Sequence, residues 1–127
     1  MSVFEKLSRY QPYALAALRI IAALLFIEHG TQKLFGFPPS TMEGALPPLL
    51  LAAALLETIG GILILIGLFT RPVAFLLSGQ MAVAYFMAHA PKSVFPAING
   101  GDAAILFCFI FLFLVTSGPG AFAVDKR

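Results

Sequence analysis

In this chain of 127 residues, four long apolar stretches follow one another with short links, and the first three carry ionisable residues in or beside them. The stretches cover about residues 13–35, 47–69, 72–90 and 103–117. Each approaches the ~20 residues that a helix needs to cross the hydrocarbon core, the fourth being the shortest. Only 11% of the residues are charged, against about 25% in a soluble domain. The chain is therefore predicted to be an all-α, polytopic membrane four-helix bundle, with residues 1–127 as a single transmembrane domain.

The division of lysine and arginine between the links predicts the orientation. With four spans, both termini lie on one side of the membrane. The basic residues of that side are Lys6, Arg9, Arg71, Lys126 and Arg127, and those of the other side are Lys33 and Lys92. Because cytoplasmic segments carry the excess of positive charge, both termini are predicted to be cytoplasmic, with the links 36–46 and 91–102 outside.

Polar and ionisable side chains inside the predicted spans are the candidates for function, because a charge in the bilayer costs at least ~2.5 kcal/mol and usually faces the bundle interior. Helix rise places Glu57 and Gln80 near mid-membrane. Glu57 shares a face with small residues, so we expect it to point at another helix and not at lipid. The outer half or its interface holds His29, Lys33, His89 and Asp102, and Tyr85 shares the face of His89. The candidate ligand-binding residues are His29, Lys33, Glu57, Gln80, Tyr85, His89 and Asp102.

Each of these groups also has a structural interpretation. Lys33, like Arg19, can extend its charged head to the membrane interface. His89 can be an interfacial histidine, Asp102 can stabilise a helix start, and Glu57 can make a purely structural hydrogen bond. Two histidines and a carboxylate also raise the question of a metal site. The chain has no H-E-x-x-H motif and no pair of ligands at i and i+4, so no metal is expected.

The third span presents polar residues on two faces. On a straight helix, Gln80 lies nearly opposite the face that carries Tyr85 and His89. Either the helix kinks, or one face meets another subunit, which makes a homodimer one of the predicted arrangements.

Several classes of protein are disfavoured by what the chain lacks. Cys108 is the only cysteine, so there is no intramolecular disulfide and no C-x-x-C redox pair. The basic residues are scattered, so no nucleic-acid partner is expected and the lipid bilayer is the predicted surrounding. No haem motif or nucleotide-binding fingerprint is present.

The order and spacing of several motifs resemble the DoxX family over nearly the whole chain. The motifs are Leu18–Arg19, His29–Gly36, Glu57–Pro72, Gln80–Pro91, Asn99–Asp102 and Gly118–Asp125. The resemblance implies a small, multi-pass bacterial inner-membrane protein of four helices. Two departures stand out, because positions 80 and 102 are often Glu in the family and are Gln80 and Asp102 here. If Glu at position 80 carries proton chemistry in relatives, Gln80 cannot do so.

Two classes of function follow from the resemblance, since relatives are implicated in sulfur oxidation with quinone as acceptor and in membrane complexes that answer oxidative stress. In the first, this chain is a redox-associated component with a quinone-like or other small-molecule site. Phe26, Phe35, Tyr85 and Phe86 would line an apolar slot, and histidine or lysine would donate to the ligand. In the second, it is a non-catalytic scaffold that docks an oxidoreductase or stress-response partner. Whether the chain is itself an enzyme stays open; as an enzyme it would be a quinone-linked oxidoreductase subunit.

Overall fold

The computed structural model of this protein describes residues 2–40 and 44–126. Residues 41–43 of the predicted outer link and Arg127 of the predicted cytoplasmic charge set therefore lie outside the described residues. Within the described part, the chain is helical and contains no strand. The predicted all-α class is confirmed.

Four helical stretches in the described residues coincide with the four predicted apolar stretches. The first is α2 (Gln11–Phe35), and the second runs without a break through α3 (Pro48–Leu55), η2 (Leu56–Gly60) and α4 (Gly61–Ile66). The third runs through α5 (Thr70–Ala84), η3 (Tyr85–His89) and η4 (Ala90–Lys92), and the fourth is α7 (Asp102–Ser117). Short helices fill the rest: α1 (Val3–Lys6), η1 (Leu7–Tyr10) and α6 (Pro96–Asn99). The segments η2 and η3 are wide π-helical turns inside otherwise α-helical stretches.

Three of these stretches are long and apolar enough to cross a membrane: Val3–Phe35, Pro48–Ile66 and Thr70–Lys92. The fourth is the shorter apolar helix α7, whose 16 residues rise about 24 Å against ~30 Å of hydrocarbon. That all four cross the membrane, and that the termini are cytoplasmic, stay predictions.

Glycine ends two of the long helices. Gly36 follows α2 with a φ of 67°, and Gly67 follows α4 with a φ of 69°. In this left-handed conformation the residue after the helix turns its N–H back onto the last carbonyls, and glycine adopts it without steric cost. The N–H of Gly36 accordingly donates to the carbonyl of Gln32 at 3.0 Å.

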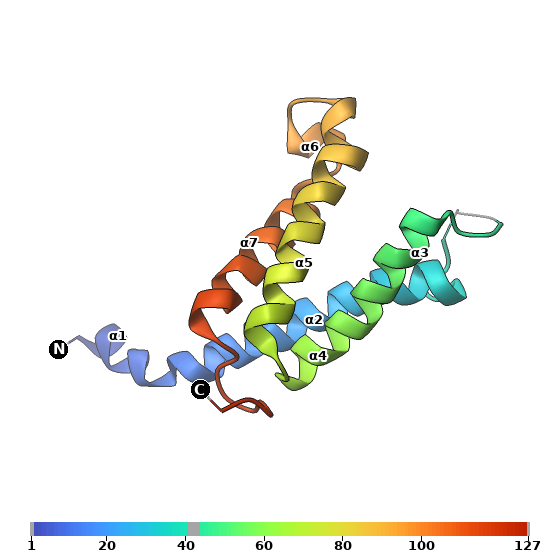
Figure 1. Ribbon diagram of the computed structural model, residues 1–127. Helices are drawn as coiled ribbons and strands as arrows, with labels where there is room; N and C mark the ends of the chain where they lie inside the picture. Colours follow the sequence, from blue (N-terminus) through green and yellow to red (C-terminus); the bar gives the residue numbers. More distant parts are fainter. Residues whose placement is uncertain (1, 41–43, 127) are drawn as a thin grey trace.

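The long helices form two arms that meet at one end and diverge toward the other (Figure 1). One arm consists of α5 and α7, which lie side by side. The other consists of α2, which packs along α3, η2 and α4. Both chain termini lie near the end where the arms meet, and α3 and α6 lie at the open end (Figure 1).

Three phenylalanine rings join the arms. Phe26 of α2 lies edge-on to Phe107 and Phe111 of α7, with ring centroids 5.4 and 5.0 Å apart. Phe26 and Phe111 are fully buried, and small residues of α2, Ala22 and Ala23, complete this part of the core. Edge-to-face rings contribute about 0.5–1.5 kcal/mol beyond their buried area, so this cluster holds the arms in contact.

Arg19 anchors the C-terminal tail against the end where the arms meet. Its guanidinium donates to the carbonyl oxygens of Ala121 at 2.9 Å and of Phe122 at 2.8 Å, and also to that of Pro119. The side chain is fully buried, so Arg19 does not extend to the membrane interface, as one interpretation of the sequence had it. A charged donor shared by several carbonyls is a strong contact, and it fixes the path of the tail.

Asp125 caps the start of α5 from this tail. Its carboxylate accepts the backbone N–H groups of Phe69 and Thr70, each at 2.8 Å. Burial acts to raise the pKa of Asp125, but the N–H groups of Thr70 and Phe69 and the charge of Arg19 outweigh it and lower that pKa below the usual carboxyl value. In return, Arg71 of α5 donates to the carbonyls of Val115 at 2.9 Å and of Thr116 at 2.7 Å near the end of α7.

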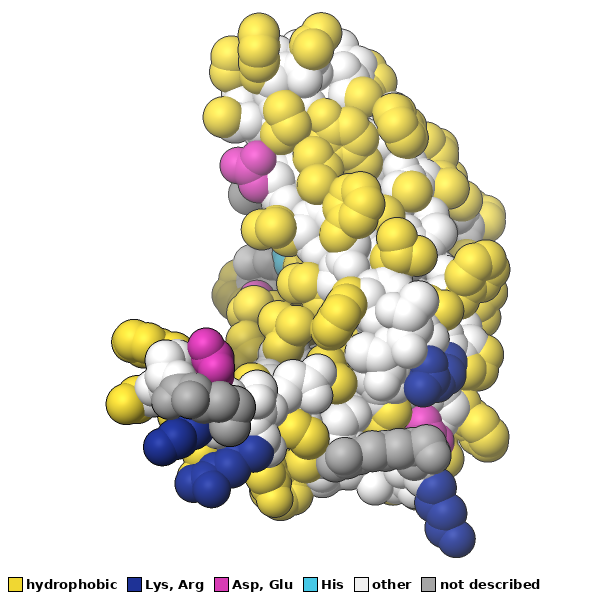
Figure 2. All heavy atoms as spheres, turned by 90° about the vertical axis from the view of Figure 1, so that its left-hand side faces the viewer, with side chains coloured by type: hydrophobic (Ala, Val, Ile, Leu, Met, Phe, Trp, Pro, Cys, Tyr) yellow, Lys and Arg dark blue, Asp and Glu magenta, His cyan; other side chains and the backbone are white. Residues whose placement is uncertain are grey.

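On the face that Figure 2 shows, the basic side chains are separated from most of the apolar ones. Figure 2 shows lysine and arginine side chains gathered at the lower end of the molecule, below a face that is mostly hydrophobic. Basic side chains at one end fit the prediction that both termini lie on the same side of the membrane.

Candidate functional site

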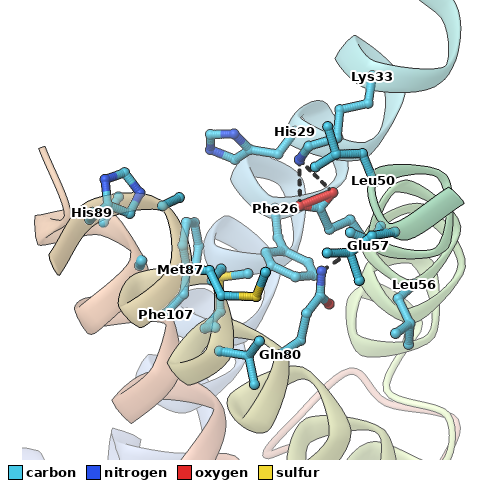
Figure 3. Close-up of a pocket in the computed structure, with 18 of the residues that line it drawn as sticks. Phe26, His29, Lys33, Leu50, Leu56, Glu57, Gln80, Met87, His89 and Phe107 are labelled. Carbon is cyan, nitrogen blue, oxygen red and sulfur yellow. Dashed lines mark hydrogen bonds and ion pairs between the residues drawn. The ribbon is translucent and has the colours of Figure 1, made fainter. Parts of the chain in front are cut away.

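A cavity of about 640 Å³ lies between the two arms. Residues of α2, α3, η2, α5, η3 and α7 line it, and most of them are apolar. Five of the seven predicted site residues line this cavity: His29, Lys33, Glu57, Gln80 and His89. Tyr85 and Asp102 do not. Figure 3 shows His29 and the Lys33–Glu57 pair toward one side of this space and His89 toward the other.

Lys33 and Glu57 form an ion pair between α2 and η2. The Nζ atom of Lys33 lies 2.6 Å from Oε1 and 2.8 Å from Oε2 of Glu57. The Glu57 side chain is 5% exposed and that of Lys33 22% exposed, so the carboxylate depends on this lysine as its counter-charge. The expectation that Glu57 points at another helix and not at lipid is confirmed. The pair forms part of the cavity wall and also ties two helices together.

Small residues let α2 and the second helical stretch approach closely beside this pair. A Cβ atom on Gly30 would collide with the hydroxyl and backbone of Thr58 and with the carbonyl of Ala54. Glycine at this position is therefore required by the contact itself. Close approach through small residues is the common way in which helices associate in membranes.

Gln80 bridges the arms at the floor of the cavity. Its Nε2 atom donates to the carbonyl of Ala53 at 3.4 Å. A carbonyl can only accept, so the orientation of the amide is fixed and Oε1 is the other atom. In the described structure this buried Oε1 has no hydrogen-bond partner. An unpaired buried acceptor is costly, so this oxygen destabilises the arrangement slightly while the amide nitrogen ties the two arms together.

His89 lines the cavity because the helix widens at η3. On a regular helix His89 would lie nearly opposite Gln80, as the sequence predicts. The π-helical turn over Tyr85–His89 changes this register, and both side chains line the same cavity. Such turns are frequent at functional sites. Both polar residues of the helix thus line one cavity, so its two polar faces alone no longer require a second subunit, and the homodimer stays a prediction.

A hydrogen-bond network behind His89 holds its ring. The Nδ1 atom of His89 lies 3.1 Å from the carbonyl oxygen of Asn99. The side-chain amide of Asn99 donates to the hydroxyl of Tyr85 and to the carbonyl of Ser93, both at 3.0 Å, and its oxygen accepts the N–H of Gly101 at 2.8 Å. Tyr85 stacks on His89 with ring centroids 6.2 Å apart. Tyr85 therefore supports the site without lining it.

His29 approaches the cavity from α2. Its ring lies edge-on to Phe107, with centroids 6.1 Å apart. No hydrogen bond joins its ring nitrogens to any residue that the structure describes. Its tautomer is therefore free to adapt to a ligand, unlike that of His89.

Asp102 occupies the first position of α7 and is exposed. A carboxylate there interacts favourably with the positive end of the helix dipole, which is the structural interpretation given above. Of the predicted aromatic lining, only Phe26 lines the cavity. Phe35 and Phe86 are 75% and 70% exposed and are not among the residues that line it, so their predicted contribution is wrong.

Sequence reasoning missed several lining residues that carry no charge. Met81, Met87 and Phe107 contribute to the walls but look like ordinary span residues in the sequence. Asn99 supports His89, although the sequence placed it only in a link and in a family motif and not at the site; its polarity in an apolar region was the available signal. Across residues 2–40 and 44–126, no three His, Cys, Asp or Glu side chains lie close enough to hold a metal ion.

Comparison with known proteins identifies one family and several relatives. The DoxX family model matches residues 14–90. An uncharacterized protein of Haemophilus influenzae strain Rd is 47% identical, over 97% of this chain and 96% of that protein. Inner membrane protein YphA of Escherichia coli K12 is 31% identical, over 92% and 91% of the two chains, and inner membrane protein YqjF of the same strain is 28% identical, over 85% and 86%. No solved structure matches significantly. Together with the apolar helices, these relatives assign the chain to a bacterial inner membrane as a multi-pass protein, as predicted.

Proposed function

The chain belongs to the DoxX family, and from this premise we propose that its cavity binds a quinone-like lipophilic molecule, as part of a redox-associated component of the inner membrane. The observation that carries the proposal is the cavity itself. It has the volume of a small-molecule site, mostly apolar walls and a few polar groups that converge on it.

The apolar and polar parts of the cavity match the two parts of such a ligand. A quinone needs an apolar slot for its ring and tail and hydrogen-bond donors at its carbonyl oxygens. Leu50, Leu56 and Met87 supply apolar wall, and His29 is available as a donor because no residue of the described structure holds its ring nitrogens. The ammonium group of Lys33 is bound by Glu57. Its main contribution to the site is therefore to balance the charge of the carboxylate, and not to donate a hydrogen bond to the ligand.

The ligand would bring its own redox chemistry. A quinone accepts and releases electrons and protons by itself, and the protein supplies binding, orientation and electrostatics. The role proposed here therefore requires no catalytic residue of this chain. An electron-transfer partner in the membrane would complete the reaction.

A direct test is to extract lipids from gently purified protein and measure quinone by mass spectrometry. Wild-type protein should carry more quinone per mole than an unrelated multi-pass protein purified in the same way. His29→Phe keeps an aromatic ring but removes the donor, and it should lower quinone retention. Phe109→Leu changes an exposed residue outside the cavity and serves as the control. Wild-type protein with no more quinone than the unrelated protein would refute the proposal.

A second candidate is a non-catalytic scaffold that docks an oxidoreductase or stress-response partner. One observation favours it: Arg19, Lys33 and Glu57 are all engaged in contacts that hold the helices and the tail. Buried charges used in this way stabilise a fold and leave binding to the outer surface. Cross-linking in membranes separates the two candidates. A scaffold should still be cross-linked to its partner protein in the His29→Phe variant, even though this variant no longer retains the quinone.

A further inference from the structure

We propose that the cavity prefers the reduced, hydroxyl-bearing form of its ligand over the oxidised carbonyl form, because His89 of η3 presents a hydrogen-bond acceptor to it. This inference rests on the proposed function and specifies which chemical form of the ligand the site recognises. One residue carries it, His89.

The contact with Asn99 fixes the role of His89. A backbone carbonyl can only accept a hydrogen bond, so Nδ1 of His89 must donate the bond of 3.1 Å to the oxygen of Asn99. Neutral imidazole has a single N–H group. Its other nitrogen, Nε2, then carries a lone pair and can only accept. His89 lines the cavity, so a group beside its Nε2 must be a donor.

The surrounding network prevents the ring from reversing this role. Asn99 is 3% exposed and is held through its side chain by Tyr85, Ser93 and Gly101. The carbonyl of Asn99 therefore keeps the position in which it accepts the hydrogen bond from Nδ1 of His89. Stacking of Tyr85 on the ring of His89 adds a second restraint on the ring orientation. The tautomer of His89 is set by the fold and does not adapt to the ligand.

Gln80 does not add a second acceptor to the cavity wall. Its amide nitrogen donates to Ala53, and its Oε1 is so fully buried that a ligand in the cavity does not reach this atom. The preference therefore rests on the donor that Nε2 of His89 requires.

The opposite wall does not reverse this preference. His29 and the Lys33–Glu57 pair lie there, and these residues can pair with either a donor or an acceptor of the ligand (Figure 3). A hydroxyl group both donates and accepts, so a hydroquinone can satisfy both walls. A quinone carbonyl only accepts, so it leaves Nε2 of His89 unpaired. The unpaired acceptor lowers the affinity of the quinone.

Three probes with the same ring and the same tail test this inference. They are a benzoquinone with a decyl tail, the corresponding hydroquinone, and the dimethyl ether of that hydroquinone, which has lost its O–H donors. Binding is measured without oxygen, to wild-type protein in lipid nanodiscs, with empty nanodiscs as background. The hydroquinone should bind about tenfold more tightly than either other probe, which is about 1.4 kcal/mol and the scale of one unpaired acceptor.

Variants assign the preference to the residue. His89→Phe should bring the affinity ratio of hydroquinone to quinone close to one. His29→Phe, the matched change on the opposite wall, should weaken both probes and preserve the ratio. Wild-type protein alone decides the main point if either variant fails to fold. A quinone or ether that binds wild-type protein as tightly as the hydroquinone overturns this inference but leaves the proposed function standing. If none of the three probes binds, the proposed function fails and the inference fails with it.

Discussion

Removing one partner of the Lys33–Glu57 pair should destabilise the protein asymmetrically. Lys33→Met leaves a carboxylate that is 5% exposed without its counter-charge. Glu57→Leu leaves a lysine that is 22% exposed, in the last turn of α2. A long side chain near a helix end can swing its ammonium to the membrane interface, whereas the buried carboxylate of Glu57 cannot leave. Lys33→Met is therefore expected to be the more damaging change.

Magnitudes follow from this difference. Loss of one partner from a buried pair costs about 3–5 kcal/mol when the other charge stays buried, which is the case for Lys33→Met. Glu57→Leu should cost about 1–3 kcal/mol, the usual penalty for lost hydrogen bonds with partial relief. The double variant replaces the whole pair by apolar side chains of similar size. It should be less destabilised than Lys33→Met alone, because no uncompensated charge remains.

Unfolding in increasing sodium dodecyl sulfate, followed by far-UV circular dichroism, measures these free energies on detergent-purified protein. The double-mutant cycle then gives the coupling energy of the two residues. Lys92→Met removes an exposed lysine of η4 and should change stability by less than about 0.5 kcal/mol. Our reasoning is refuted if Glu57→Leu costs as much as Lys33→Met, or if the double variant is as unstable as the sum of the two single ones.

Three further predictions concern the other end of the molecule and the topology. In a Cys108→Ala background, a cysteine in place of the exposed Val94 should react with an impermeant thiol reagent added outside the cell, and one in place of Lys126 should not; the reverse pattern would show that the termini are external. Arg19→Met should free the tail from its carbonyl contacts, cost about 1.5–3 kcal/mol and expose the tail to carboxypeptidase in detergent, and a tail that stays protected would contradict the anchoring role. Asp125→Asn should lower the melting temperature at neutral pH. Because the folded-state pKa of Asp125 lies below the usual value of about 4, its stabilisation is fully present above pH 4 and is lost as the pH falls through that lower pKa, so wild type and variant should converge in acid. A melting-temperature difference that stays constant down to low pH would mean that the charge of Asp125 does not stabilise the fold.

The positions of the long helices could be predicted from the sequence because apolar length alone decides them. A stretch such as residues 13–35 has no other structure available in lipid, where every backbone group must be paired within its own segment. The same logic predicted that Glu57 would be buried against another helix, since an uncompensated charge cannot face hydrocarbon. Its partner could not be predicted, because several basic residues lie at compatible depths.

The convergence of Gln80 and His89 could not be predicted, because the projection onto helix faces assumes a constant turn per residue. One wide turn at Tyr85–His89 is enough to rotate everything that follows it. No residue in that segment marks it as a π-helix. The sequence therefore gave two interpretations, a kink or a second subunit, and only the structure shows that the helix itself realigns the faces.

The contacts of Arg19 were hidden for a different reason. Its partners are backbone carbonyls of the tail, about 100 residues later in the chain, and backbone groups carry no sequence signal. These contacts also explain how the molecule divides its tasks. Where the arms meet, Arg19, Arg71 and Asp125 pair with backbone groups and tie the tail to the helices. Toward the open end, His89 uses only its Nδ1 atom within the described structure, and its ring lines the cavity. A polar atom that the fold leaves unpaired beside a cavity is one that a ligand can recognise.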